Sequence, residues 1–380
     1  MTPSVSGDEE AAVRLVAAAM EEVGFDEVRI DSSGNAVGVA RPDQSVDDNG
    51  PKLLIDGHID SIPLHSPERW TVDPFGGEIA QGRLYGLGIC DQKASVAAAV
   101  HGVAEARRLG RLGGPVAVVA SVCEEAMEGQ GLAEAVGWFG PDLVITTEPS
   151  DTRLCIGQRG RAKVQATLTG RAAHAGHAQE GLNAADALAA LIMEVRAVDH
   201  PTHPNLGRRD ITCIDIASWP MPSVSTVPGL AQARFDCRFL PGETRESVVD
   251  LVRGCASTAW ARWPEVPALE VALVRADFRS WTGAAFRADE FCAAWWTDED
   301  SSLVQGAQRA LVAAGLDSTP THYSFCTNGS FTAGVLGIPT IGFGVGYEHT
   351  AHQVDEFVTL DSLGAGERGF ASLAARLTSS

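Results

Sequence analysis

Three short, mainly apolar segments in the first part of the chain alternate with segments that have the composition of helices. The apolar segments span residues 52–56, 115–122 and 143–147, and the helix-like segments 91–109 and 129–138 lie between them. Strands that are apolar on both faces occur in parallel sheets covered by helices on both sides. The alternation therefore predicts an α/β fold built on a mostly parallel sheet.

A second pattern begins at Arg161. It comprises, in order, strand-, helix-, strand-, strand-, helix- and strand-like segments at residues 163–169, 183–198, 210–217, 230–238, 243–258 and 269–274. This β-α-β-β-α-β order is that of the ferredoxin-like fold. The helix-like segments 303–314 and 360–377 then return to the first pattern. We therefore predict a larger domain in two segments, residues 1–159 and 283–380, with an inserted α+β domain at residues 160–282.

The charge of the chain excludes some classes of partner. Its formal net charge is −20, from 49 acidic and 29 basic residues. Such a field repels phosphate backbones and anionic lipids, so we expect neither nucleic acid nor a membrane surface as a partner. The first residues are acidic where a signal peptide would be basic, and the eight cysteines include no Cys-x-x-Cys pair. These features predict a cytoplasmic protein.

Five residues that can bind metal lie at the ends of apolar segments or in turns. They are His58 in Gly-His-Ile-Asp, Asp91 in Gly-Ile-Cys-Asp-Gln-Lys, Glu125 in Cys-Glu-Glu, Glu148 in Thr-Thr-Glu-Pro and His352 in Ala-His-Gln-Val-Asp-Glu. Ligands gather at the carboxyl ends of parallel strands. Since an open catalytic zinc takes about three protein ligands, these five residues suit a pair of zinc-like ions that share one carboxylate.

Taken singly, three of the motifs have structural alternatives. His58 and Asp60 fall on the same side of an extended chain, so Asp60 is either the carboxylate partner of a metal-bound imidazole or a simple cap. Asp91 is equally the N-cap of the helix that follows it. Glu148 precedes a proline and is equally a turn residue.

The adjacent carboxylates of Glu124 and Glu125 are harder to explain by structure alone. Two acidic side chains directly after a buried strand raise the electrostatic cost of folding unless a cation offsets them. Their side chains diverge, so that one can bind metal while the other faces a water molecule as a proton-transfer base. In the last motif, position alone does not choose between His349 and His352.

Together, the motifs Gly-His-x-Asp, Gly-x-x-Asp-x-Lys, Glu-Glu, Glu-Pro and His-x-x-Asp-Glu resemble, in order and spacing, those of a family of dinuclear zinc amidohydrolases and peptidases. This is the family of acetylornithine deacetylase, succinyl-diaminopimelate desuccinylase and carboxypeptidase G. The similarity extends over nearly the whole chain. The stretch from Thr327 to Gly344 is most similar to the branch described as selenium-metabolism hydrolases.

The resemblance implies a role for each matching residue. The implied metal ligands are Asp91 as the bridge, His58 and Glu148 at one ion, and Glu125 and His352 at the other, with His352 chosen over His349 by its spacing to Asp355-Glu356. The implied catalytic residues are Glu124 as general base, Asp60, and His174, which in the family reaches the active site of the partner subunit. The implied substrate-binding residues are Arg238, Thr327, Asn328 and Gly329.

The resemblance also implies a function. The chain is expected to hydrolyse the amide bond of an N-acylated amino acid or small peptide-like substrate that bears a carboxylate. It would use two zinc ions, with cobalt or manganese as possible substitutes, and would form a homodimer through the inserted lid domain. A dipeptidase or carboxypeptidase is the alternative, followed by a non-catalytic homologue or a metal-dependent biosynthetic enzyme. Ser225 replaces an asparagine that often contacts substrate in the family.

Overall fold

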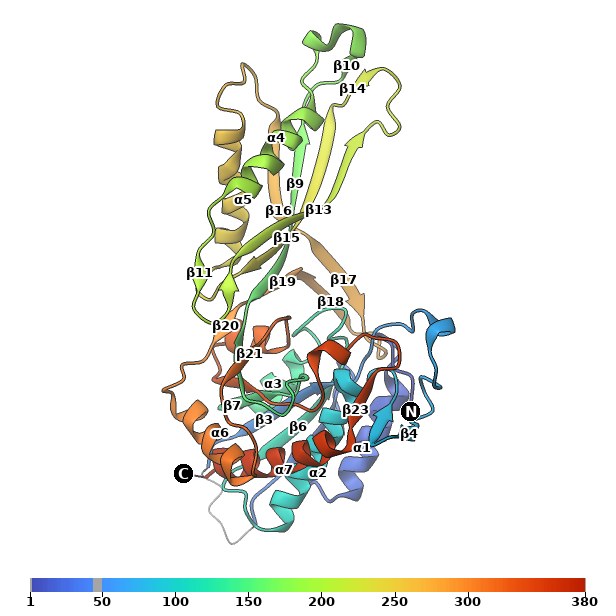
Figure 1. Ribbon diagram of the computed structural model, residues 1–380, viewed down its shortest axis with the longest axis vertical. Coiled ribbons are helices and arrows are strands. Elements are labelled where there is room, and N and C mark those ends of the chain that lie inside the picture. Colours follow the sequence, from blue (N-terminus) through green and yellow to red (C-terminus); the bar gives the residue numbers. More distant parts are fainter. Residues whose placement is uncertain (1, 44–49, 380) are drawn as a thin grey trace. The chain divides into compact units, whose positions relative to one another are not determined.

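The computed structural model describes residues 2–43 and 50–379, and the chain divides into two compact units (Figure 1). The first unit comprises Met1–Gln158, Asp277–Arg287 and Trp295–Ser380, and the second comprises Arg159–Ala276 and Ala288–Ala294. These bounds differ from the predicted ones at Arg159 and between residues 277 and 294.

The difference between residues 277 and 294 arises from one hairpin. Strands β17 (Arg275–Arg279) and β18 (Ala285–Asp289) pair with each other, so the chain enters the first unit and leaves it again. At the turn between them, Trp281 packs against the core of the first unit, and its indole N–H donates to the Gly34 carbonyl at 3.1 Å. The aromatic contact ties the hairpin tip to this unit.

The first unit is built on a mixed sheet that has nine strands in the described part of the chain. The central strands β6, β3, β7 and β22 run parallel, and the flanking strands β1, β2 and β20 are antiparallel to their neighbours. The predicted α/β class is confirmed, and parallel pairing is concentrated in the centre of the sheet. The strand order is β1 (Glu27–Ile30), β2 (Ala36–Ala40), β6 (Val116–Ser121), β3 (Leu53–His58), β7 (Leu143–Thr146), β22 (Thr340–Gly342), β8 (Cys155–Gln158) and β20 (Trp295–Trp296), with β21 (Thr321–Tyr323) beside β8.

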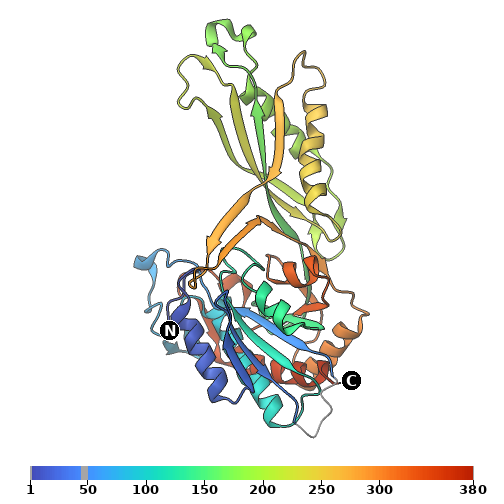
Figure 2. The same cartoon turned by 180° about the vertical axis from the view of Figure 1, so that it is seen from behind.

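Helices cover both faces of this sheet, as Figures 1 and 2 show from opposite sides. Leu53 and Ile55 share a core cluster with the helices on one face, whereas Leu54 points to the other face and packs near α3. Successive side chains of a strand alternate between faces, so a continuous apolar run fills both cores. The helices are α1 (Glu10–Glu22), α2 (Ala94–Arg108), α3 (Ala133–Phe139), α6 (Ser302–Ala313) and α7 (Leu360–Leu377).

A small antiparallel sheet of β4 (Ile79–Ala80), β5 (Arg83–Tyr85) and β23 (Phe357–Thr359) completes the first unit. Its strand β23 follows the segment that holds His352, so this sheet joins the C-terminal motif to the turn before Asp91. Among the helices of the described residues, none combines the length and apolar character that crossing a bilayer requires.

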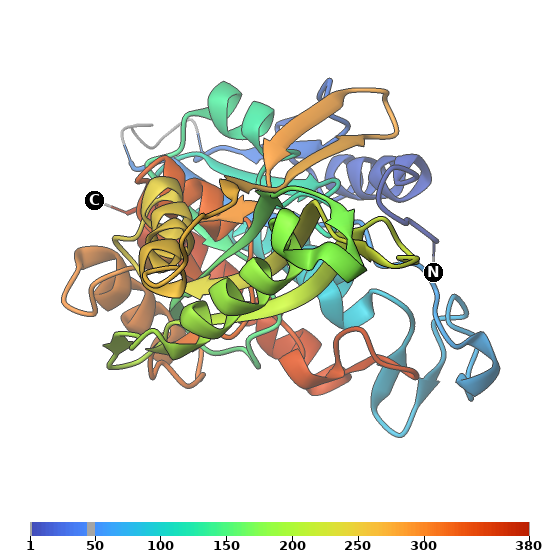
Figure 3. The ribbon, with the colours of Figure 1, turned by 90° about the horizontal axis from the view of Figure 1, so that it is seen from above.

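The second unit has the predicted β-α-β-β-α-β order. Its sheet runs β13-β15-β9-β16, all antiparallel, with the short strand β19 beside β9. Helices α4 and α5 lie alongside one another on one face (Figure 3). The main elements are β9 (Gly160–Thr169), α4 (Ala184–Ala197), β13 (Asp210–Trp219), β15 (Leu230–Phe239), α5 (Arg245–Ala259), β16 (Ala268–Leu273) and β19 (Phe291–Cys292). The short hairpin strands are β10 (Ala173–His174), β14 (Thr226–Val227), β11 (Thr202–His203) and β12 (Gly207–Arg208).

Candidate metal centre

The carboxyl ends of three parallel strands carry the acidic and histidine side chains that the sequence singled out. His58 is the last residue of β3, Glu124 and Glu125 follow β6, and Glu148 follows β7. Since these strands are neighbours in the sheet, the side chains meet at one edge. His58, Glu124 and Glu148 form one cluster of close ligand atoms, and His58, Asp91 and Glu125 form a second.

Asp91 lies between two imidazoles. Its Oδ1 is 2.9 Å from Nε2 of His58, and its Oδ2 is 3.2 Å from Nε2 of His352. His352 also contacts Oε1 of Glu125 at 2.8 Å. His349 instead has its ring beside Tyr347, with ring centroids 5.5 Å apart, and it is exposed. The geometry therefore brings His352, and not His349, to Asp91.

Asp91 lies inside a single π-helical turn, η2 (Ile89–Lys93), with a non-helical backbone of its own, and the N-cap of α2 is Lys93. Asp91 has φ −117° and ψ 88°, and α2 begins only at Ala94. The alternative that Asp91 caps a helix is therefore wrong. Glu356 holds the turn, because its Oε1 accepts the N–H of Cys90 at 2.7 Å and of Asp91 at 3.2 Å. Glu356 is thus part of the site's framework, a role that its place in the last motif did not reveal.

Glu124 points into the same cluster as Glu148. Its Oε2 is 3.8 Å from Nε2 of His58, and Oε1 of Glu148 is 3.9 Å from the same nitrogen. The other oxygen of Glu124, Oε1, is buried and has no hydrogen-bond partner in the described part of the chain. A buried carboxylate oxygen without a hydrogen bond lowers the stability of the fold. The position of the Glu124 carboxylate is therefore consistent with a chemical role.

Asp60 contacts this centre in an unexpected way. The ring Nδ1 of His58 meets the backbone carbonyl of Asp60 at 3.0 Å, whereas the Asp60 carboxylate is 3.6 Å away. The expectation that the carboxylate orients His58 is therefore wrong in detail. Its Oδ1 accepts the backbone N–H of Glu124 and its Oδ2 that of Glu125, both at 3.1 Å. The Asp60 carboxylate therefore positions the backbone of Glu124 and Glu125.

The N-terminal segment fastens these loops from the other side. The Ser6 hydroxyl donates to Oδ2 of Asp60 at 2.7 Å, and Ser4 donates to the carbonyl of Ile59 at 2.7 Å. Glu9 accepts the backbone N–H of Cys123 at 3.2 Å. Cys123 has φ 61°, a left-handed backbone conformation that is unfavourable for residues other than glycine. No motif of the sequence marks this segment as part of the site, because only the fold brings it there.

The electrostatics of the cluster follow from burial of several carboxylates together. Burial raises the pKa of Glu124 and Glu148 well above 4.5, and neighbouring carboxylates raise both further. Burial also favours the neutral form of Asp91, but hydrogen bonds from His352 and His58 outweigh it and hold its pKa well below 3.8. The hydrogen bonds to Asp91 and Glu125 raise the pKa of His352 to about 10.

These residues fit a metal centre. Carboxylate oxygens and imidazole nitrogens are the donors that zinc takes in catalytic sites, and the excess of buried negative charge is what a divalent cation would offset. The orphaned Oε1 of Glu124 is a further buried acceptor. Because Nδ1 of His58 donates to a backbone carbonyl, its Nε2 is the nitrogen that faces the carboxylates.

The remaining predicted residues are not members of these ligand clusters. Thr327, Asn328 and Gly329 are buried in the first unit, where Thr327 donates to Gln158 at 2.7 Å and Asn328 to Oδ2 of Asp56 at 2.9 Å. The side-chain hydrogen bonds of Thr327 and Asn328 are used within the protein, so a substrate contact by residues 327–329 stays a prediction.

His174 and Arg238 belong to the second unit. His174 is exposed at the end of β10, and its Nδ1 accepts the N–H of Gly176 at 3.0 Å. Arg238 on β15 donates to Asp236 at 2.6 Å and is half-buried. Ser225 has φ 49°, a region in which asparagine is less strained than serine, and its carbonyl accepts the N–H of Ala175 at 2.8 Å.

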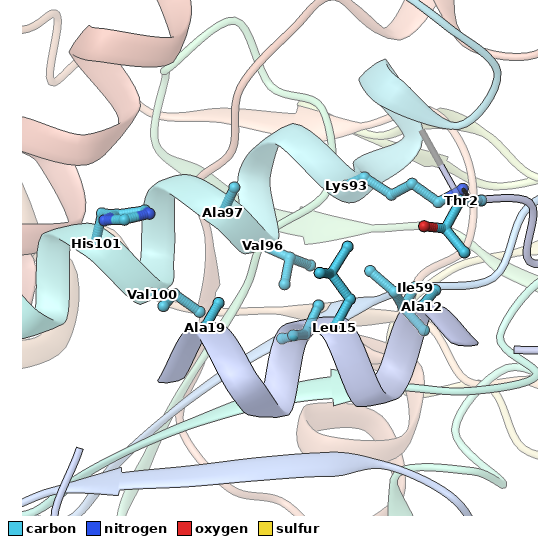
Figure 4. A pocket seen from close by; sticks show the side chains of 11 residues that line it. Thr2, Ala12, Leu15, Ala19, Ile59, Lys93, Val96, Ala97, Val100 and His101 are labelled. Atoms are coloured by element: carbon cyan, nitrogen blue, oxygen red, sulfur yellow. Dashed lines mark hydrogen bonds between the residues drawn. The ribbon is translucent and has the colours of Figure 1, made fainter. Parts of the chain in front are cut away.

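A separate cavity of about 240 Å³ lies between α1 and α2 (Figure 4). Its walls are largely aliphatic side chains such as Leu15, Val96 and Val100. Lys93 points toward Thr2 and donates to its carbonyl at 3.3 Å. No carboxylate lines this cavity among the described residues, so it is distinct from the metal centre.

Comparisons with known proteins agree with this geometry. The family model described as "Peptidase family M20/M25/M40" matches residues 54–376. The uncharacterized protein YgeY of Escherichia coli (strain K12) is 30% identical over 362 residues, which is 93% of this chain and 86% of that protein. Succinyl-diaminopimelate desuccinylase 2 of Ruegeria sp. (strain TM1040) is 31% identical over 266 residues, 66% of this chain and 65% of that protein.

A solved structure shows the same fold. Aminopeptidase PepT from Bacillus cereus superimposes with a TM-score of 0.75 at 18% identity, covering 99% of this chain and 95% of that one. With the matched residues and the clustered ligands, the chain belongs to peptidase family M20/M25/M40 and is a metal-dependent hydrolase of peptide or amide bonds.

Proposed function

We propose that this protein removes the acyl group from an N-acylated amino acid at a centre of two zinc ions. Asp91 would bridge the ions, with His58 and Glu148 at one and Glu125 and His352 at the other. The contact of Asp91 with both imidazoles, at 2.9 and 3.2 Å, is the single observation that best supports a shared ligand. Bound there, divalent ions would polarise the scissile carbonyl and acidify a water molecule.

Glu124 is the proposed general base. Its Oε1 is buried and has no hydrogen-bond partner among residues 2–43 and 50–379, so it is available to accept a proton from water and to pass it to the leaving amine. Asp60 supports this role because it binds the backbone N–H groups of both Glu124 and Glu125. Arg238 would hold a substrate carboxylate, for which a guanidinium offers paired donors.

A homodimer through the second unit is part of the proposal. Strand β13 is an edge of its sheet, and its side chains Ile214 and Ile216 are 51% and 63% exposed. On α4, Met193 is 61% exposed. Unpaired edges that carry apolar side chains favour pairing with another chain, and isologous pairing is the commonest way to close an oligomer. In such a dimer His174 would serve the partner's site and steady the developing oxyanion.

A deacylase and a peptidase differ in the group attached to the amine. The named desuccinylase among the relatives favours an acyl group that itself ends in a carboxylate. The test is a substrate screen of N-acetyl and N-succinyl amino acids beside free dipeptides, with added zinc, cobalt or manganese. Preference for the acylated amino acids supports the proposal, and faster turnover of dipeptides would replace it with a dipeptidase or carboxypeptidase. Loss of all turnover after chelation, restored by one metal, would identify the ion.

A further inference from the structure

Arginine side chains gather around a cavity in the second unit, in a chain whose net charge is −20. The cavity has a volume of about 740 Å³ and lies where the C-terminal end of α4 faces the start of β13. This volume is within the range of roughly 300–1,000 Å³ that small-molecule sites occupy. Its lining residues all belong to the second unit, and none of them is a candidate metal ligand.

The rim of the cavity is positively charged. Its guanidinium groups belong to Arg159, Arg196, Arg208 and Arg209, and Asp210 is the lining carboxylate. Arg196 is exposed and, among the described residues, has no acidic side chain within ion-pair distance. In the described part of the chain, the acidic neighbour of Arg208 is the fully exposed Asp199, at a loose 3.7 Å. Solvent screens such an exposed pair, so it neutralises Arg208 little.

Arg209 forms a fixed wall of the same cavity. Its side chain is 14% exposed and donates to Glu243 at 2.6 Å and to Nδ1 of His200 at 3.1 Å. Burial and the charges of Arg209 and Arg208 lower the pKa of His200 below 6.5, so the ring is neutral near pH 7. Because Nδ1 accepts, the ring proton is on Nε2. The Arg209 guanidinium and the Nε2–H of His200 are therefore donors whose positions are fixed by hydrogen bonds within the protein.

The floor of the cavity is apolar. Ile192 and Val195 line it from α4, Ile211 from β13 and Phe235 from β15. Ile211 and Phe235 belong to the core cluster of this unit and are buried. Ile192 is the partly exposed member of this group, so a ligand can place an apolar part against it beside an anionic group.

We propose that this cavity is a second ligand site, which binds a small organic anion through Arg196 and Arg208 and packs its apolar part against the partly exposed Ile192. Guanidinium groups bind carboxylate and phosphate oxygens with paired hydrogen bonds, and either group satisfies the observed donors. The little-neutralised guanidinium groups of Arg196 and Arg208 oppose the average field of the chain, which favours anions over neutral molecules of the same shape.

Titration calorimetry of the metal-loaded protein at constant ionic strength tests the proposal. The probes are phenyl phosphate, phenylsuccinate and the neutral analogue benzyl alcohol. We expect at least one anion to bind saturably with a Kd below about 1 mM and benzyl alcohol to bind more weakly. In the variant Arg196→Gln/Arg208→Gln the Kd of that anion should rise at least tenfold. The matched control is Arg262→Gln/Arg275→Gln, which removes two exposed arginines of the same unit outside the cavity and should bind as the wild type does.

The outcomes separate the sources of binding. Preference for phenyl phosphate identifies a phosphate ligand, and preference for phenylsuccinate a carboxylate. Heat that persists in the cavity variant comes from another site, such as the metal centre. The proposal is overturned if neither anion binds the wild type, if the cavity variant and the control bind equally, or if benzyl alcohol binds as tightly as the anions.

Discussion

The Ser6 hydroxyl donates a hydrogen bond of 2.7 Å to Oδ2 of Asp60, the same oxygen that accepts the backbone N–H of Glu125. A residue at the very start of the chain is thereby linked to the loop that carries the proposed general base. Ser6 does not touch the ligand clusters, so it acts by holding Asp60 in place.

Ser6→Ala should lower kcat about tenfold, the equivalent of a lost hydrogen bond to a charged group, with KM and metal content unchanged. Ser6→Thr retains the hydroxyl and should restore activity. Ser4→Ala is the control, because Ser4 binds the Ile59 carbonyl from the same segment and should affect stability more than kcat. Equal losses of kcat in both alanine variants would mean that the segment is merely structural.

Metal content should depend on Asp91 more than on any other ligand. Because Asp91 contacts both imidazoles, Asp91→Ala damages both proposed sites and should lose close to two ions per subunit. His352→Ala should lose mainly one. Elemental analysis of the purified variants measures this, and unchanged metal content in Asp91→Ala would refute the bridging role.

Glu124→Gln removes the proposed base while it keeps the size of the side chain. Turnover should fall by at least about 10²-fold, as expected for a lost general base, while metal binding persists. Steady-state kinetics beside elemental analysis distinguish this from a lost ligand. Activity near that of the wild type would assign proton transfer to another group.

The free energy of unfolding of the protein should contain a contribution from Glu9 that falls as the pH rises. Burial raises the pKa of Glu9 above 4.5, so the folded state holds the proton more tightly than the unfolded chain does. The stability that this provides is present below pH 4.5 and is lost as the pH rises through the raised pKa.

Glu9→Gln cannot ionise, so its free energy of unfolding should rise relative to that of the wild type between pH 4.5 and pH 7.5. Urea denaturation at both values measures the change, and Glu10→Gln, at an exposed neighbouring position, controls for loss of a charge. A relative change of the opposite sign would contradict the burial argument.

The proposed dimer predicts complementation between inactive subunits. A mixture of Glu124→Gln and His174→Ala subunits should form about half mixed dimers, each with one intact site, and should recover about a quarter of wild-type activity. Verified subunit exchange without recovery would mean that His174 acts within its own subunit or not at all.

Much of this protein can be predicted from residue order. Apolar segments that fill both faces of a sheet predict parallel strands, and a polar residue at the end of each predicts where His58, Glu125 and Glu148 meet. Local periodicity likewise predicts the β-α-β-β-α-β unit, because strands and helices bury their side chains with different periods.

Other features depend on contacts between segments that are distant in the chain. The turn at Asp91 is held by Glu356, Asp60 binds backbone N–H groups instead of the His58 ring, and Ser6 and Glu9 reach the site from the N-terminus. The arginines around the second-unit cavity come from α4 and the segments around β13. A hydrogen bond or a cluster of charges has no periodicity along the chain, so only the tertiary structure decides which of these groups meet.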